Sequence, residues 1–406
     1  MKALQFVDSV PRYVITKALG SFWKGVFYSP IACLVYRDIP EPTLPGPDWV
    51  KIRTRYSGIC GSDVNLVLLH DSPSTSPYAS FPFTIGHENV GVISEVGSHV
   101  TDFRPGDRVV PDPLLPCVVR GIEPPCPYCQ RGDYSLCVNF TRGNIAPGMG
   151  IGTCRDTGGG WSPYFLAHRS QLLRVPDSLA DEQAVLADPF ASSLHPLMHH
   201  FPDEGQTVLV IGAGIIGLGI VAGLRALGSK ARMVVLARHG FQAELAQHYG
   251  ADQVVRTGAG YVSRMAEALG TISLKTMIGK PVLEDGADLV FECVGSSGSI
   301  DDALRFAGRG GKVVLVGLAA VPKGVDWSFI WLKELQVAGS FWSSTETHQG
   351  KPIRTYQLAL DLMASGAVDL APLLTHRFRL HEYKKAFATL TDKKSSHVVK
   401  AAFVFD

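Results

Sequence analysis

The chain has 406 residues, of which 46% are hydrophobic and 18% charged, and its formal net charge is +1. This length accommodates two domains of ordinary size, and the composition is typical of a globular protein rather than a disordered one. The near-neutral charge provides no general attraction to nucleic acid or to an acidic membrane. No apolar run reaches the roughly 18 residues of a membrane span. We therefore expect neither a nucleic-acid nor a membrane partner.

The N-terminal segment, residues 9–30, contains basic side chains among apolar ones and no acidic side chain. Charges interrupt every apolar run, so the compact hydrophobic region of a secretory signal is missing. Val14, Leu19, Phe22 and Val26 recur at near-helical spacing, which predicts an amphipathic helix. Between a transit peptide and a helix packed over the first domain we favour the helix. We expect it to cover a functional site or a subunit contact.

Residues 35–115 consist of short apolar runs separated by turns, such as Val50–Thr54, Val90–Val96 and Arg108–Val110. This pattern predicts an antiparallel β region rich in loops. Residues 111–163 are crowded with Pro, Gly and Cys. A hydrophobic core alone would not order such a lobe, so we expect a structural metal there.

From about residue 188, buried strands alternate with helices. The predicted strands are 207–211, 233–236, 289–291 and 312–316, with helices ending near Leu227 and Gly250. Such alternation predicts βαβ units and a parallel sheet. We expect a first domain over residues 1–187, a second over 188–342, and a tail over 343–406 that returns to the first domain.

A glycine-rich turn follows the strand at 207–211 and opens a helix. Gly212 allows the tight turn, Gly214 lets the backbone approach a pyrophosphate, and Gly217 lets helix and strand pack closely. Ile215 and Ile216 lie at the helix N-terminus, where the partial positive charge favours phosphate. This strand–turn–helix context predicts a dinucleotide site rather than an ordinary turn.

The second strand of this region determines which dinucleotide is preferred. It ends in Leu236-Ala237-Arg238-His239, without the acidic residue that would bind a ribose 2′-hydroxyl. Ala237 leaves room for a 2′-phosphate, and Arg238 offers a planar fork of donors. We therefore predict NADP(H) over NAD(H), with Arg238 and His239 at the cofactor.

Three side chains have the chemistry of a catalytic zinc site. Cys60, in Cys60-Gly61-Ser62-Asp63, supplies sulfur; His87, in Gly86-His87-Glu88, supplies nitrogen; and Asp188 could supply oxygen. Catalytic zinc takes three protein ligands and keeps one position open. Taken singly, Cys60 could be an ordinary buried thiol, His87 a core histidine and Asp188 a helix N-cap. Their joint occurrence favours a metal site.

In this order the motifs resemble the zinc-dependent medium-chain dehydrogenase/reductase family over nearly the whole chain. The resemblance implies a GroES-like, mainly antiparallel β catalytic domain and a Rossmann-type, doubly wound parallel sheet coenzyme domain. The Asp188-Pro189 step points to the alcohol, polyol, glucose and threonine dehydrogenase branches, where the acid is usually Glu. The resemblance also implies a homodimer or homotetramer.

Further site residues are implied by this resemblance alone. Glu88 approaches the metal, and Asp63 orients His87. Ser62 passes the alcohol proton towards solvent, although Asn65 stands where a relay histidine is common. Val294 and Gly317 line the cofactor site.

The cysteines of the lobe have metal-site spacing, Cys126-x2-Cys129-x7-Cys137. Either Glu123 or Cys117 could be the fourth ligand, and we favour Cys117 because closed structural zinc sites prefer sulfur. A lobe that has lost its metal is the alternative. This clustering argues against disulfides and for a reducing cytoplasm.

The sequence thus predicts a zinc-dependent oxidoreductase, with one catalytic and one structural zinc, that transfers hydride between NADP(H) and an alcohol or polyol. The alternatives are a carbonyl reductase acting mainly in reverse and a non-catalytic nucleotide-binding protein on the same fold. Neither substrate nor direction follows from the motifs.

Overall fold

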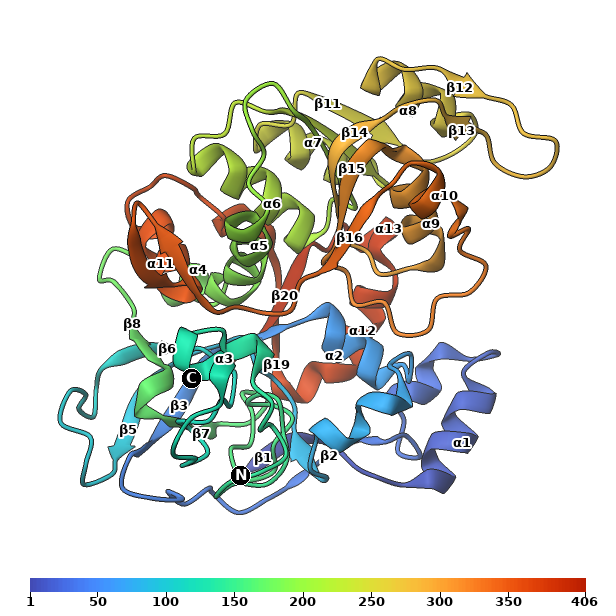
Figure 1. Cartoon of the computed structure of the whole chain (residues 1–406). Coiled ribbons are helices and arrows are strands. Elements are labelled where there is room, and N and C mark those ends of the chain that lie inside the picture. The colour runs from blue at the N-terminus through green and yellow to red at the C-terminus, as the bar shows by residue number, and fades with distance from the viewer. The chain divides into compact units, whose positions relative to one another are not determined.

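The computed structural model describes residues 1–406 and divides into two compact units. Unit 1 comprises Met1–Asp188, Ser343–Glu346 and Gly350–Asp406, and unit 2 comprises Pro189–Trp342 and Thr347–Gln349. The chain therefore leaves unit 1 after Asp188 and returns to it at Ser343, and it enters unit 2 once more only for Thr347–Gln349 (Figure 1). No helix has the length and apolar character needed to cross a bilayer.

Unit 1 contains a seven-stranded sheet in the order β19-β20-β3-β5-β6-β8, with β7 pairing β3. Its strands are β3 (Trp49–Ile59), β5 (Asn89–Val96), β6 (Arg108–Pro111), β7 (Tyr164–His168), β8 (Leu172–Arg174), β19 (Leu374–Arg379) and β20 (Lys400–Val404). Most pairs are antiparallel, and the C-terminal strand β20 pairs with β3 in the register Ala401↔Ile59. A smaller sheet has the order β2-β1-β4, from β1 (Lys2–Phe6), β2 (Leu34–Asp38) and β4 (Phe83–Thr84).

Short helices connect these strands. They are α1 (Val10–Leu19), η1 (Lys24–Tyr28), α2 (Gly61–Val67), η2 (Pro73–Tyr78), α3 (Pro127–Arg131), η3 (Tyr134–Leu136), η4 (Arg169–Gln171), α4 (Asp181–Ala184), α11 (Thr355–Ala364), η5 (Ala371–Leu373), η6 (Leu380–Glu382), α12 (Tyr383–Thr391) and α13 (Lys393–Ser396). Two cores hold unit 1 together. One gathers Leu4, Phe83, Trp161 and Phe403, and the other gathers Val50, Ile93 and Phe165.

Unit 2 is built on a six-stranded sheet in the order β11-β10-β9-β14-β15-β16, whose pairs are all parallel. The strands are β9 (Thr207–Ile211), β10 (Arg232–Ala237), β11 (Gln253–Arg256), β14 (Ala287–Glu292), β15 (Ala307–Leu315) and β16 (Gln336–Gly339). In chain order this is 3-2-1-4-5-6, the order of Rossmann-type dinucleotide domains. The predicted fold class is therefore confirmed.

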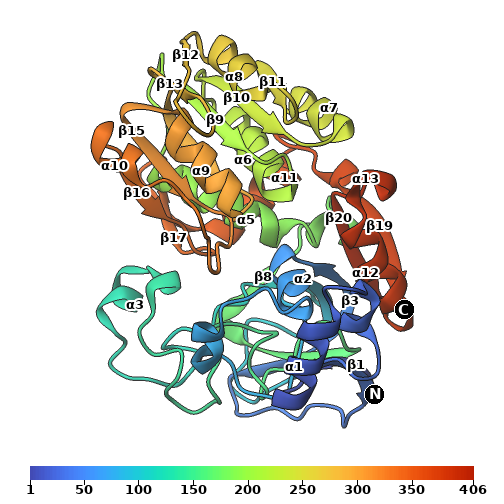
Figure 2. The same ribbon diagram turned by 90° about the vertical axis from the view of Figure 1, so that its right-hand side faces the viewer.

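The helices of unit 2 are α6 (Ile215–Ala226), α7 (Gly240–His248), α8 (Tyr261–Leu269), α9 (Ser297–Phe306) and α10 (Ser328–Leu332), and they lie between successive strands in sequence (Figure 2). Buried Leu209, Val234, Val290 and Val313 on the central strands form its core. A hairpin of β12 (Ser273–Leu274) and β13 (Val282–Leu283) projects from this unit (Figure 1). The division between units falls in α5 (Ala187–His199), and β17 (Thr345–His348) and β18 (Lys351–Arg354) lie where the chain returns to unit 1.

Candidate active site, thiolate lobe and nucleotide site

Cys60, His87 and Glu88 converge within unit 1. Cys60 is the N-cap of α2, directly after β3, whereas His87 and Glu88 lie between β4 and β5. The ligand atoms of all three lie within 4.8 Å of one another. Gly58 on β3 leaves the space for Glu88, because a Cβ at Gly58 would lie 2.0 Å from Glu88 Oε2. A thiolate, an imidazole and a carboxylate this close have the chemistry of a zinc site.

Asp63 fixes two members of this group. Its Oδ2 accepts a hydrogen bond from the Cys60 backbone N–H at 2.9 Å, and its Oδ1 lies 3.4 Å from His87 Nδ1. Burial by itself lowers the pKa of His87, but the Asp63 carboxylate and the Cys60 thiol outweigh burial and raise that pKa well above its ordinary value. A metal would take the place of the proton that this arrangement favours.

Glu88 is held by Lys400, a residue that the sequence did not bring to attention as part of the site. Glu88 is 1% exposed and Lys400, the first residue of β20, is 2% exposed, and the two form an ion pair. Glu88 Oε1 accepts a hydrogen bond from Lys400 Nζ, and Glu88 Oε2 is paired with the same ammonium group. Lys400 therefore keeps the Glu88 carboxylate charged beside Cys60 and His87, which suits a site for a cation.

Asp188 lies in the first turn of α5 and is 5% exposed. It is not a member of the group within 4.8 Å. Its Oδ2 instead accepts a hydrogen bond from the hydroxyl of Tyr356, near the start of α11. Burial raises the pKa of Asp188 to about 6, even though His87 opposes this shift. Burial also raises the pKa of Tyr356, so this hydroxyl stays protonated and remains a donor.

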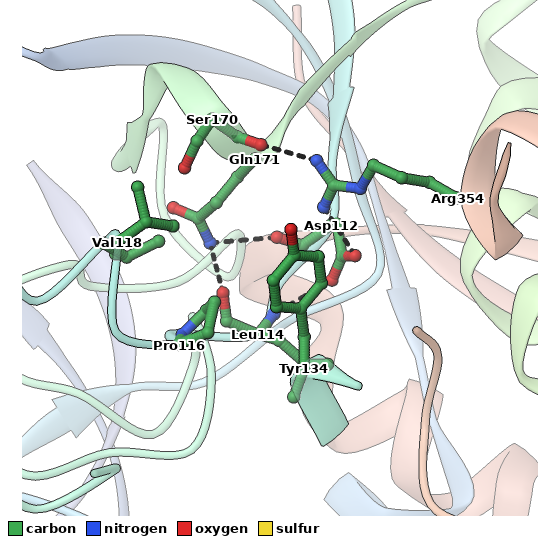
Figure 3. A pocket seen from close by; sticks show the side chains of 9 residues that line it. Asp112, Leu114, Pro116, Val118, Tyr134, Ser170, Gln171 and Arg354 are labelled. Atoms are coloured by element: carbon green, nitrogen blue, oxygen red, sulfur yellow. Dashed lines mark hydrogen bonds and ion pairs between the residues drawn. The ribbon is translucent and has the colours of Figure 1, made fainter. Parts of the chain in front are cut away.

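The start of α11, and with it Tyr356, is fixed by the polar cluster in Figure 3. Arg354, the residue before α11, donates to Asp112 Oδ2 at 2.7 Å and to the Ser170 carbonyl at 2.5 Å. Gln171 Nε2 donates to the carbonyl oxygens of Asp112 and Leu114, each at 2.9 Å. The cavity beside these groups has a volume of about 30 Å³, which holds at most a few water molecules. We therefore interpret this cluster as a support for α11 rather than a substrate pocket.

The other members predicted for the catalytic group lie on α2. Ser62 is in its first turn, two residues after Cys60, and is half-buried. Asn65 lies one turn further along the same helix, and its carbonyl accepts a hydrogen bond from the His70 N–H at 2.8 Å. The helix thus places Ser62 next to the Cys60 ligand.

Four sulfurs gather in the loop lobe. Cys117, Cys126, Cys129 and Cys137 have their Sγ atoms within 4.8 Å of one another, and Glu123 is not in the group. Cys117 Sγ accepts hydrogen bonds from the Cys126 N–H at 3.3 Å and from Asn139 Nδ2 at 3.2 Å. Donors aimed at sulfur stabilise thiolates, and all these cysteines are free of disulfides. Four thiolates at this spacing suit a closed tetrahedral zinc site.

The glycine turn of unit 2 has the geometry of a dinucleotide site. Gly212 has φ +98°, and a Cβ at Gly217 would lie 1.8 Å from the Gly212 carbonyl oxygen, so both positions require glycine. Gly214 is the N-cap of α6, and the space beside its Cα is open. Ile215 and Ile216 begin the helix, so their backbone N–H groups lie at its N-terminus. The turn therefore leaves room beside Gly214 at the N-terminus of α6.

Neighbouring strand ends complete this edge of the sheet. Arg238 is exposed directly after β10, and His239 is the N-cap of α7. A Cβ at Gly212 would meet Val294 Cγ2 at 2.4 Å, and a Cβ at Gly317 would meet the Gly295 nitrogen at 2.2 Å. The predicted residues thus meet at the carboxyl ends of β9, β10, β14 and β15, where such sheets bind ligands.

Glu292, at the end of β14, is a further residue of this edge that the sequence did not reveal. It is fully buried, and its Oε1 accepts hydrogen bonds from the N–H groups of Val294 and Gly295 at 2.9 and 3.0 Å. Burial raises the pKa of Glu292. The Glu292 carboxylate therefore orders the loop that carries Val294. The only feature of the sequence that could have indicated this role is that an acidic residue ends an otherwise apolar strand.

Known proteins match both units. The family model of the alcohol dehydrogenase GroES-like domain matches residues 46–177, and that of the zinc-binding dehydrogenase matches residues 216–365. An L-threonine 3-dehydrogenase of Anaeromyxobacter sp. (strain K) is 29% identical over 89% of this chain and 93% of its own. That of Pectobacterium atrosepticum is 28% identical over 89% of each.

Solved structures agree with these matches. An NADP-bound zinc-binding dehydrogenase from Sinorhizobium meliloti 1021 has a TM-score of 0.73 and 27% identity, covering 100% of this chain and 99% of its own. The 2R,3R-butanediol dehydrogenase of Bacillus subtilis, at 24% identity, shares the fold with a TM-score of 0.71, covering 100% and 99%. The fold, the two groups of ligands and these matches agree: the chain belongs to the zinc-dependent medium-chain dehydrogenase family.

Proposed function

We propose that this member of a family of oxidoreductases acting on alcohols is an NADP(H)- and zinc-dependent alcohol or polyol dehydrogenase. The observation that carries the proposal is the convergence of Cys60, His87 and Glu88 within 4.8 Å. A nucleotide-binding protein that had lost catalysis would have no need to keep a buried thiol, imidazole and carboxylate together. We therefore place the non-catalytic alternative second.

The catalytic zinc would be held by Cys60, His87 and one carboxylate, either Glu88 or Asp188. When bound, zinc is a Lewis acid that lowers the pKa of an alcohol and polarises a carbonyl. Asp63 holds His87 and Cys60 in place, and Lys400 balances the charge of Glu88. We assign Ser62 as the hydroxyl that takes the alcohol proton. Because Asn65 cannot exchange a proton at neutral pH, the route from Ser62 to solvent does not run through it.

We assign the cofactor to the edge of unit 2 around Gly212–Gly217. The exposed Arg238 after the small Ala237 supports a preference for a 2′-phosphate, since Arg forms bidentate hydrogen bonds with phosphate. We assign Val294, Gly317 and His239 to the same cofactor site. We also propose a structural zinc on the four cysteines of the lobe, a homodimer or homotetramer, and a cytoplasmic location.

Two measurements on the purified protein test the proposal. The first is metal content by mass spectrometry, for which we expect two zinc ions per chain. The second is NADPH formation from NADP with alcohols, polyols and L-threonine, the last included because curated relatives are L-threonine 3-dehydrogenases. Turnover of any alcohol supports the proposal. Zinc without turnover of any alcohol, but with NADPH-dependent reduction of ketones, would favour the carbonyl reductase. Absence of both zinc and turnover would overturn the enzyme assignment.

A further inference from the structure

The N-terminal segment turns its apolar side chains outward. Helix α1 lies at the outer edge of unit 1 (Figure 1), and Thr16 is its only buried residue. Val10 is 76% exposed, and Phe22 and Trp23, just after the helix, are 90% and 61% exposed. An ordinary surface helix places its apolar stripe against the core. A helix is thus present over Val10–Leu19, but Val14 and Leu19 of the predicted apolar pattern face outward, and only Val26 of that pattern is buried.

The polar side chains of α1 face the protein and hold the helix in this orientation. Arg12 donates to the carbonyls of Pro30 and Ala32 at 3.0 and 2.7 Å. Lys17 donates to the carbonyl of Leu69, two residues after the end of α2. These contacts tie both ends of α1 to unit 1, so its apolar residues cannot turn inward without breaking them.

The segment after α1 anchors the helix to the core. Val26 and Phe27 in η1 are buried, and the rings of Tyr28 and Phe387 of α12 stack with centroids 6.0 Å apart. Phe22 and Trp23 therefore project from a fixed base rather than from a loose tail. Together with Val10, Val14, Ile15 and Leu19 they form what we call the outer apolar face.

The outer apolar face has a basic surround. Residues 9–30, which carry this face, contain Arg12, Lys17 and Lys24 and no acidic residue. Helix α12, which contacts η1, adds the exposed Lys384, whereas its neighbour Lys385 lies 3.6 Å from Glu382. The net charge of the whole chain is only +1 and gave no reason to expect a membrane partner. That total does not reveal the local excess of basic side chains beside this face.

We propose that the outer apolar face docks on the surface of an anionic lipid bilayer. Exposed aliphatic side chains on a short helix, followed by exposed aromatic ones and with basic residues nearby, are features of segments that lie in the bilayer interface. Trp and Phe are suited to this depth, and lysines are attracted by anionic headgroups. A second copy of the chain fits less well. A two-fold contact would bring Lys24 near its own copy with no acidic residue in the segment to compensate.

Sedimentation with vesicles tests this proposal on the full-length protein. We expect it to bind vesicles of phosphatidylglycerol mixed with phosphatidylcholine, to bind phosphatidylcholine alone much more weakly, and to be released at high salt. The variant Phe22→Ser/Trp23→Ser should bind about tenfold more weakly or worse, because it removes two large apolar side chains. Lys24→Gln should bind about fivefold more weakly.

A matched control is available at the tip of the β12–β13 hairpin. Met277 and Ile278 are 101% and 92% exposed, and we expect Met277→Ser/Ile278→Ser to bind vesicles like the wild type. Three results would overturn the proposal: no binding to either vesicle, equal loss in both serine pairs, or undiminished binding by the Phe22/Trp23 variant. A change of oligomeric state in that variant without lipid, with unchanged vesicle binding, would assign the face to a second copy instead.

Discussion

Replacing Lys400 tests how the buried carboxylate of the site is kept charged. Lys400 and Glu88 are 2% and 1% exposed, so water screens neither. Lys400→Met keeps an unbranched apolar side chain but leaves the Glu88 carboxylate without its counter-charge. Removing one partner of a buried ion pair costs about 3–5 kcal/mol. We expect the zinc-free variant to lose about that much free energy of unfolding.

A double variant separates the charge from the packing. In Lys400→Met/Glu88→Gln no charge is left unpaired, so we expect it to recover most of the stability lost by the single variant. Zinc beside Glu88 would also supply positive charge, and the single variant should therefore be destabilised less when loaded with zinc than when free of it.

Urea unfolding followed by far-ultraviolet circular dichroism and by tryptophan fluorescence measures these differences. Two probes are needed because the two compact units could unfold separately. A single free energy of unfolding applies only if the transitions seen by the two probes coincide. If Lys400→Met has the wild-type midpoint, or if the double variant is as unstable as the single one, then Lys400 does not compensate Glu88 and our account of this pair is wrong.

Three further substitutions test the other assignments. Tyr356→Phe removes one hydroxyl without opening a cavity. We expect it to weaken zinc binding, measured by chelator competition, by about tenfold, because Asp188 loses a hydrogen bond of about 1–3 kcal/mol; unchanged affinity would make this contact merely structural. Cys117→Ser should lower the zinc content by one ion per chain while Glu123→Gln leaves it unchanged, and the opposite result would reverse our choice of ligand. Arg238→Ala should reduce kcat/KM for NADP about tenfold or more and spare NAD, since a charged hydrogen bond to phosphate is lost; equal effects on both cofactors would argue against a 2′-phosphate contact.

The sequence by itself determined the fold class and most of the local chemistry. The strand at 207–211, the turn at Gly212 and the helix after it follow from short-range requirements, because an apolar run, a positive φ and a helix N-terminus are each properties of a few adjacent residues. The preference of closed zinc sites for sulfur likewise favoured Cys117 over Glu123 as the fourth ligand of the lobe, and the structure places Cys117 with the other three cysteines.

Only the tertiary structure brought together residues from distant parts of the chain. Lys400 meets Glu88 because β20 pairs with β3, and Tyr356 meets Asp188 because α11 begins beside α5; no spacing in the sequence encodes either contact. The side chains within 4.8 Å of Cys60 and His87 likewise include Glu88, for which Gly58 leaves the space, and not Asp188.

The N-terminal helix shows the same limit of sequence periodicity. The spacing of Val14, Leu19, Phe22 and Val26 predicted an amphipathic helix, whereas α1 ends at Leu19, Phe22 follows it exposed, and Val26 lies buried in η1. It could not predict which side faces the protein, because that depends on the carbonyls that Arg12 and Lys17 find in the folded chain. Periodicity determines that a helix has two faces, and the surrounding structure decides which of them is buried.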